Sequence, residues 1–302
     1  MENLVFLILI VLTLIDIKLK GSNQFFEDYM DLKYTQPIKG IFVWFIILSH
    51  YKSYYKTNNN YLYRKILYCF SQKMVSLFLF YSGFGIYESI KNKGSYYAKS
   101  LIKKSFIIFI KSQIIIFLFM VCNLLIGKKY CIKTYFFSII FYKSIGNSNW
   151  FAFTIIIFYL YSFISFSYIK YKQFYFVGIF MISIICIFHM YFIYNYYYPK
   201  LIYSVDNTFC FIIGFYYSLL KNYIDKILLK NDIFYFTFIF FFILIYYYFY
   251  VYHIKNVFIY SMINMLFCLI AIFISMKIRF NNEFLNSHSY SIYLLQRLVM
   301  RY

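Results

Sequence analysis

The chain has 302 residues, of which 63% are hydrophobic and 13% are charged. A soluble domain cannot bury this much apolar surface, so lipid must be the solvent for most of the chain. A formal net charge of +20 would suggest a nucleic-acid partner for a soluble protein. Here Lys and Arg fall mainly in short loops and at helix ends, where they act as topology signals and contact anionic lipid. No nucleic-acid partner is indicated.

The first apolar segment covers residues 4–19. No basic residue precedes it, no A-x-A-like cleavage site follows it, and Lys18 and Lys20 lie at its end. This pattern favours an uncleaved helix with its N-terminus outside the cell over a removed signal peptide.

Apolar segments then recur along the chain, at residues 38–51, 66–90, 105–127, 150–169, 174–194, 207–220, 233–252, 257–277 and 287–302. They are continuous rather than alternating, which favours helices over barrel strands. The shorter stretch 131–142 is interpreted as interfacial or re-entrant. The last segment is short for a span, which fits a truncated chain or a short final helix. We therefore predict an all-α, polytopic transmembrane helical bundle of about ten spans in the cell membrane.

The loops between these segments differ in basic content. The richer set comprises residues 18–39, 91–104, 170–173, 221–232 and 277–286, and the poorer set comprises 52–65, 128–149, 195–206 and 253–256. The positive-inside rule places the richer set in the cytoplasm. This orientation puts Lys39 on the cytoplasmic side.

The most informative helix carries Lys39 and His50. Eleven residues at about 100° and 1.5 Å each bring the two to nearly the same face, roughly 16 Å apart. If Lys39 lies at one surface, His50 lies about halfway through a hydrocarbon layer of roughly 30 Å. An ionisable group at that depth is a functional-site hypothesis, and an imidazole suits general-base chemistry. The alternatives are a neutral histidine bonded to a neighbouring helix and a lysine that only anchors the helix end.

A second polar segment is Phe80-Tyr-Ser-Gly-Phe-Gly-Ile-Tyr87, in which Ser82 offers a hydroxyl and Gly83 and Gly85 allow close helix approach. The lysine-rich stretch that follows includes Lys103 and Lys104. These lysines are either topology signals or a basic collar for a phosphate-bearing donor.

A third segment is Asn147-Ser-Asn-Trp-Phe151, at the start of a long apolar helix. Trp150 in this position is typical of an anchor at the membrane interface. No Cys-x-x-Cys or other metal-ligand spacing occurs among the six cysteines, so we expect no metal.

Together these features resemble the type-3 membrane-bound acyltransferases. The resemblance covers roughly residues 33–302 and rests on the basic-x10-His helix with Gly40, the Ser-Gly-Phe-Gly segment with its lysine-rich loop, the Asn-x-Trp-Phe start and the closing Ser289-Tyr-Ser-Ile-Tyr-Leu-Leu295. It implies an acyltransferase-like transmembrane domain over 33–302, preceded by an additional N-terminal helix and loop over 1–32.

The resemblance also implies O-acylation of a cell-surface carbohydrate or lipid-linked glycan by cytoplasmic acyl-CoA, commonly acetyl-CoA. The residues concerned are His50 as general base, Lys39, Lys103 and Lys104 as donor-binding groups, and Ser82, Asn149 and Trp150 in support. Gln36 stands where members often carry Asp, and Gln296 where they often carry His. An inactive homologue is therefore one alternative.

A transporter or flippase for a lipid-linked glycan or small solute is the other alternative. Transporters coupled to protons or ions usually need buried carboxylates and often show internal repeats. The ten acidic residues here lie almost entirely in loops, and no repeat is evident. The sequence therefore favours the acyltransferase hypothesis.

Overall fold

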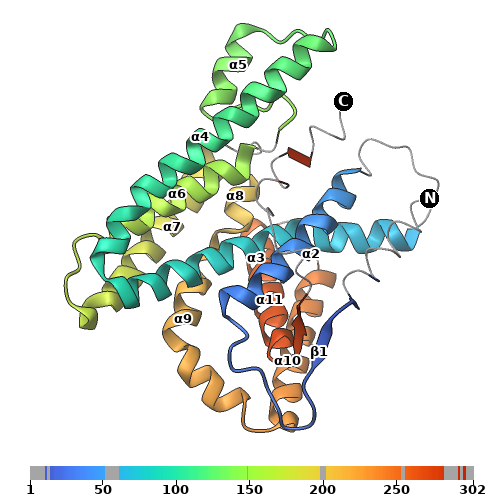
Figure 1. Ribbon diagram of the computed structural model, residues 1–302, viewed down its shortest axis with the longest axis vertical. Helices are drawn as coiled ribbons and strands as arrows, with labels where there is room; N and C mark the ends of the chain where they lie inside the picture. The colour runs from blue at the N-terminus through green and yellow to red at the C-terminus, as the bar shows by residue number, and fades with distance from the viewer. Residues whose placement is uncertain are drawn as a thin grey trace. The chain divides into compact units, whose positions relative to one another are not determined.

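A computed structural model describes residues 11, 14–51, 61–147, 149–197, 202–252, 256–281, 292, 295 and 296 (Figure 1). Nine of the α-helices in this part of the chain have eight residues or more. The helices are α2 (Leu32–Tyr51), α3 (Tyr61–Lys93), α4 (Ser95–Leu125), α5 (Ile132–Ile139), α6 (Asn149–Phe166), α7 (Tyr175–Tyr197), α8 (Ile202–Asp206), α9 (Thr208–Leu228), α10 (Asp232–Val251) and α11 (Val257–Ser275), with a 3-10 turn η1 (Lys172–Phe174). The predicted all-helical class is confirmed.

Four stretches of the described chain are long and apolar enough to cross a membrane: Ser95–Leu125, Lys172–Tyr196, Asp232–Val251 and Val257–Ser275. Only 22% of the apolar window of α4 and 11% of that of α10 is buried inside the protein. Their exposed Phe and Ile side chains therefore need an apolar solvent, which indicates a membrane protein.

The count of about ten spans is not reached in the described residues. Helices α2, α3 and α9 carry lysines, tyrosines and serines that lower their hydropathy. The apolar part of α6, Trp150–Phe166, is shorter than the four candidates. The expected segments 4–19 and 287–302 lie largely outside the described residues. Where residues 17–19 are described, they form a strand rather than the end of a helix.

The chain divides into two compact units. Unit 1 comprises Met1–Phe84 and Phe209–Ser289, and unit 2 comprises Gly85–Thr208 and Tyr290–Tyr302. These two units do not test the predicted division of the chain into residues 1–32 and 33–302, which stays a prediction.

In unit 1, α3 and α9 cross at glycines. A Cβ on Gly83 would lie 2.2 Å from the carbonyl oxygen of Phe211, and a Cβ on Gly214 would lie 2.3 Å from that of Phe80. Each helix thus inserts a glycine against the backbone of the other, which is the small-residue packing typical of membrane helices. At Gly85 a Cβ would have no atom within 4 Å. The expected role in close approach therefore holds for Gly83 and not for Gly85.

One end of unit 1 is closed by residues 17–31, 221–232 and 276–281, which we call the loop cap. Strand β1 (Ile17–Leu19) pairs antiparallel with β2 (Ile278–Phe280). The ammonium of Lys277 lies 2.5 Å from a carboxylate oxygen of Asp232, and Arg279 pairs with Asp28. The described residues of three loops in the richer set, 18–31, 221–232 and 277–281, thus meet at one end of unit 1. Which side of a membrane they face stays a prediction.

A buried phenol fixes the middle of the loop cap. The hydroxyl of Tyr29 donates to Asp225 at 2.7 Å and lies 2.7 Å from the hydroxyl of Tyr217. Burial, and then the neighbouring Tyr217 and Asp225, raise the pKa of Tyr29 well above its usual value. Tyr29 therefore holds its proton, and with it the hydrogen bond that ties residues 20–31 to α9.

In unit 2, α6 packs along α4 and α7 packs on α6. A Cβ on Gly178 would lie 2.3 Å from the ring of Phe166, so α7 approaches α6 closely at this glycine. The buried side chains between α4 and the start of α6 include Ile116, Phe119 and Ala152.

Residues 128–147 of unit 2, which we call the 128–147 hairpin, fold back beside α4 (Figure 1). The side-chain amide of Gln113 donates to the carbonyl of Ile139 at 3.0 Å, and the rings of Phe109 and Phe141 lie 5.8 Å apart between centroids. Near the end of α4, the side-chain amide of Asn123 donates to the carbonyl of Ile145 at 3.0 Å. The chain therefore runs back along α4, reverses near residue 141 and returns.

Candidate functional site

Helix α2 is continuous from Leu32 to Tyr51, so Lys39 and His50 share a face as the sequence predicts. The helix begins six residues before the predicted start at 38. The carbonyl of Asp31 accepts the amides of Tyr34 and Thr35 at 3.0 Å each, and the polar first turns lie against the loop cap, with Thr35 buried. Pro37 lies within these turns and does not end the helix.

The early start changes the positions of the two residues along the axis. At about 1.5 Å per residue, Lys39 lies roughly 10 Å from the start of α2 and His50 roughly 27 Å from it. His50 is in the last turn of the helix. Lys39 is therefore more than one turn inside the helix, on the loop-cap side, and His50 is near the opposite end.

Lys39 packs against α3 of the same unit. Its side chain is half-buried, and the ammonium lies 5.0 Å from the centroid of the Tyr81 ring. Tyr81 is buried, and within the described residues its hydroxyl has no hydrogen-bond partner. This cation–π contact holds the ammonium of Lys39 in place. A lysine that only anchors a helix end in solvent would not need such a contact.

His50 and Ser82 belong to the same unit as Lys39. Both are half-buried, and both interact with neighbouring groups. Ser82 lies on α3 between Tyr81 and Gly83, where α3 crosses α9. Unit 1 thus carries one predicted base, one predicted donor-binding lysine and one supporting hydroxyl.

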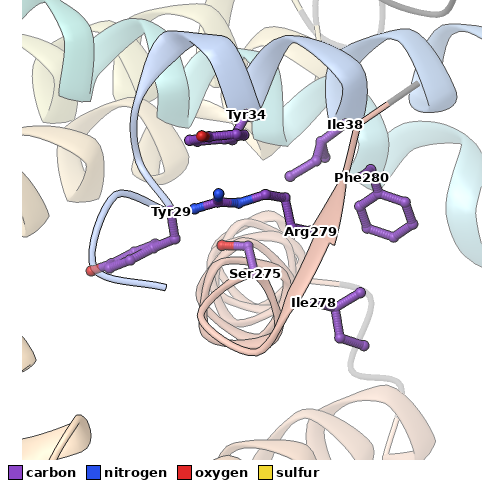
Figure 2. A pocket seen from close by; sticks show the side chains of 7 residues that line it. All are labelled: Tyr29, Tyr34, Ile38, Ser275, Ile278, Arg279 and Phe280. Atoms are coloured by element: carbon purple, nitrogen blue, oxygen red, sulfur yellow. The ribbon is translucent and has the colours of Figure 1, made fainter. Parts of the chain in front are cut away.

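A small pocket lies at the loop-cap end of α2, and Ile38, the neighbour of Lys39, forms part of its wall (Figure 2). The guanidinium of Arg279 stacks on Tyr34 at 3.5 Å from the ring centroid, with Ser275 beside it. The cavity volume of about 10 Å³ admits about one water molecule and is far below the roughly 300–1,000 Å³ typical of pockets for drug-sized ligands. Because Arg279 is also paired with Asp28, we assign this pocket to the packing of the loop cap against α2 and not to donor binding.

The remaining predicted site residues belong to unit 2. Lys103 on α4 is exposed, and Lys104 is half-buried with its ammonium 3.8 Å from the centroid of the Tyr97 ring. Trp150, near the start of α6, is half-buried beside Tyr203 at 5.7 Å between ring centroids. Asn149 is the first residue of α6, and its side chain lies outside the described part of the structure. The predicted set is therefore divided between the two units, each with its own internal geometry.

A polar group that the sequence does not reveal surrounds His189 in unit 2. Its Nδ1 lies 3.1 Å from the hydroxyl of Tyr161 and its Nε2 lies 3.1 Å from the hydroxyl of Ser204. The histidine is buried, and Ser204 has no exposed surface. Tyr161 lies 28 residues before His189 and Ser204 lies 15 residues after it, so no short sequence spacing indicates these hydrogen bonds. It has the partners of a serine–histidine pair but no access for a substrate, and we assign it to helix packing.

No group of three metal-ligating side chains occurs in the described chain. Comparison with known proteins returned no match to any family model, curated protein or solved structure. The fold defines the class as an all-helical protein whose described residues include four candidate membrane-spanning helices.

Proposed function

We propose that the protein is an integral membrane acyltransferase that moves an acyl group, commonly acetyl, from cytoplasmic acyl-CoA to a hydroxyl of a cell-surface carbohydrate. The observation that supports this most is the placement of Lys39 and His50 on one face of α2, both half-buried. The resemblance of residues 33–302 to the type-3 membrane-bound acyltransferases gives the reaction class. The protein is proposed to cross the cell membrane several times.

The reaction assigns one task to each residue. An imidazole nitrogen of His50 accepts the proton of the sugar hydroxyl while the oxygen attacks the thioester carbonyl carbon. The carbon–sulfur bond then breaks, and the departing CoA thiolate takes the proton back from the imidazolium. Lys39, on the loop-cap side, attracts the anionic donor as a point charge, and Lys103 and Lys104 are proposed to do the same.

Transport is the weaker alternative because the candidate spans lack internal carboxylates. Among the four, the only acidic residue is Asp232, which is the first residue of α10 and pairs with Lys277 in the loop cap. Proton- or ion-coupled transport usually relies on carboxylates inside the membrane.

The test replaces His50 with Gln and measures alkali-labile acetate on surface carbohydrate of cells that express the protein. We expect transfer to fall by about 10²–10⁴-fold, the usual contribution of a general base. The matched control is Ser49→Ala, the neighbouring half-buried position on α2. Undiminished transfer in His50→Gln at equal membrane abundance would exclude the mechanism. Glycan movement into liposomes without acyl-CoA would favour a transporter instead.

A further inference from the structure

Helix α5 has an apolar face that points away from unit 2. Ile132 is 84% exposed, Phe136 63% and Ile140 51%. Ile132 and Phe136 are four residues apart and lie on one side of the helix. Ile140 is the residue that follows its last turn. The opposite side carries Ser138, which is fully buried, and Tyr135, which packs in the cluster beside α4. This amphipathicity is the reverse of that of a helix on a soluble protein, where the apolar face turns inward.

The position of the 128–147 hairpin along α4 gives its depth. The part of α4 between Lys104 and its end at Leu125 is apolar except for Lys111 and a few uncharged polar residues. It has a length of about 32 Å, close to the roughly 30 Å of a hydrocarbon layer. Gln113, which bonds the far end of α5, lies about 18 Å from Leu125 along this axis. If α4 spans the membrane, the hairpin enters the hydrocarbon layer and leaves by the same face.

Two backbone carbonyls, one at the end of α5 and one in the non-helical stretch that follows it, have hydrogen-bond donors on α4. Non-helical backbone is tolerated at membrane depth only where its polar groups are satisfied. The carbonyls of Ile139 and Ile145 accept from the side-chain amides of Gln113 and Asn123. These two amides on α4 therefore suit a re-entrant segment.

The hairpin is also strongly basic. It carries four lysines and no acidic residue, and all four are exposed: Lys128, Lys129, Lys133 and Lys143. The ammonium of Lys143 lies 5.5 Å from the ring centroid of Phe137, so its aliphatic stem runs along α5. An apolar face bordered by four cations is complementary to a lipid with acyl chains and a negative headgroup.

We propose that the 128–147 hairpin is a re-entrant segment that binds an anionic phospholipid. The headgroup phosphate contacts the lysines, and the acyl chains lie on the face formed by Ile132, Phe136 and Ile140. This inference is independent of the proposed transfer reaction, because none of these residues belongs to the proposed catalytic machinery.

The first test measures depth. The chain has two tryptophans, Trp44 and Trp150, so a Phe136→Trp variant adds one reporter. In nanodiscs that contain phosphatidylcholine with brominated acyl chains, we expect at least twofold quenching of the added fluorescence relative to the unbrominated lipid. The parent protein supplies the background. Quenching of the added tryptophan by aqueous iodide and not by bromine would place the face in water, as for a soluble partner, and overturn the proposal.

The second test measures lipid preference. Protein in nanodiscs with equal phosphatidylcholine and phosphatidylglycerol is released into detergent, and retained lipid is counted by native mass spectrometry. We expect K128Q/K129Q/K133Q/K143Q to retain phosphatidylglycerol several-fold less often than the parent. The control, K170Q/K172Q/K226Q/K230Q, removes the same charge from exposed lysines elsewhere. Equal retention in the hairpin variant and the parent, or an equal loss in the control, would contradict a site at the hairpin.

Discussion

At the scale of single residues, Lys39 is the group whose structural and functional roles are easiest to separate. Lys39→Gln keeps an unbranched polar side chain, although a shorter one, and removes the charge that faces Tyr81 and, in our proposal, the donor. We expect the KM for acetyl-CoA to rise by about tenfold with a smaller change in kcat, since the charge acts in binding. Steady-state transfer with purified protein in nanodiscs measures both constants.

Lys39→Arg is the matched variant. A guanidinium retains the charge, can stack on Tyr81 and can contact a phosphate through two parallel hydrogen bonds. We expect its KM to equal that of the parent or to be lower. Equal KM values for Lys39→Gln and the parent would remove Lys39 from the donor site and leave it as a packing residue against α3.

At the scale of helices, the crossing of α3 and α9 gives a sharp contrast between two nearby glycines. Gly83→Ala would place a methyl group 2.2 Å from a backbone carbonyl oxygen of α9, so one helix must shift. Overpacking of this kind typically costs about 1–3 kcal/mol. Gly85→Ala adds its methyl group where no atom lies within 4 Å. We expect Gly83→Ala alone to lower the thermal unfolding temperature in detergent, and a similar loss in Gly85→Ala would contradict this account of the crossing.

The elements also show which parts of the structure the sequence could predict. Apolar length and helical periodicity predict α2, α4, α7, α10 and α11, because these depend on local residues alone. The fold-back of the 128–147 hairpin depends on Gln113 and Asn123, and nothing in their sequence context marks them as partners of Ile139 and Ile145. Strand β1 was missed for the same reason, because its partner β2 lies more than 250 residues away.

The candidate site follows the same rule. The shared face of Lys39 and His50 could be predicted, because it follows from helical geometry within one continuous element. The contact between Lys39 and Tyr81 could not, because it needs the packing of α3 on α2. The start of α2 at Leu32 depends likewise on the loop cap, which covers polar turns that would otherwise favour a later start.

At the scale of the whole molecule, the alternation of loops predicts labelling on opposite sides of the membrane. Cys131, at the start of α5, is exposed and belongs to the poorer loop set. We expect a membrane-impermeant maleimide to label it in intact cells, and Cys131→Ser to lose that label. Ser22→Cys adds a thiol at an exposed position in the loop cap.

The thiol of Ser22→Cys should react only after the membrane is permeabilised, since the loop cap belongs to the loop set predicted to be cytoplasmic. Labelling of this thiol in intact cells would reverse the orientation. The Cys131→Ser background keeps the two signals apart.

The pairing of β1 with β2 has a consequence for biogenesis. A ribosome releases residues 17–19 early and residues 278–280 only near the end of synthesis, and all of the described chain between residues 85 and 208 belongs to the other unit. While unit 2 is being synthesised and inserted, strand β1 therefore has no partner strand and Asp28 has no salt-bridge partner. Unit 1 can close only after most of the chain has left the ribosome. An arrest of translation before residue 278 would leave β1 without its partner strand and Tyr34, in the first turn of α2, without the guanidinium of Arg279.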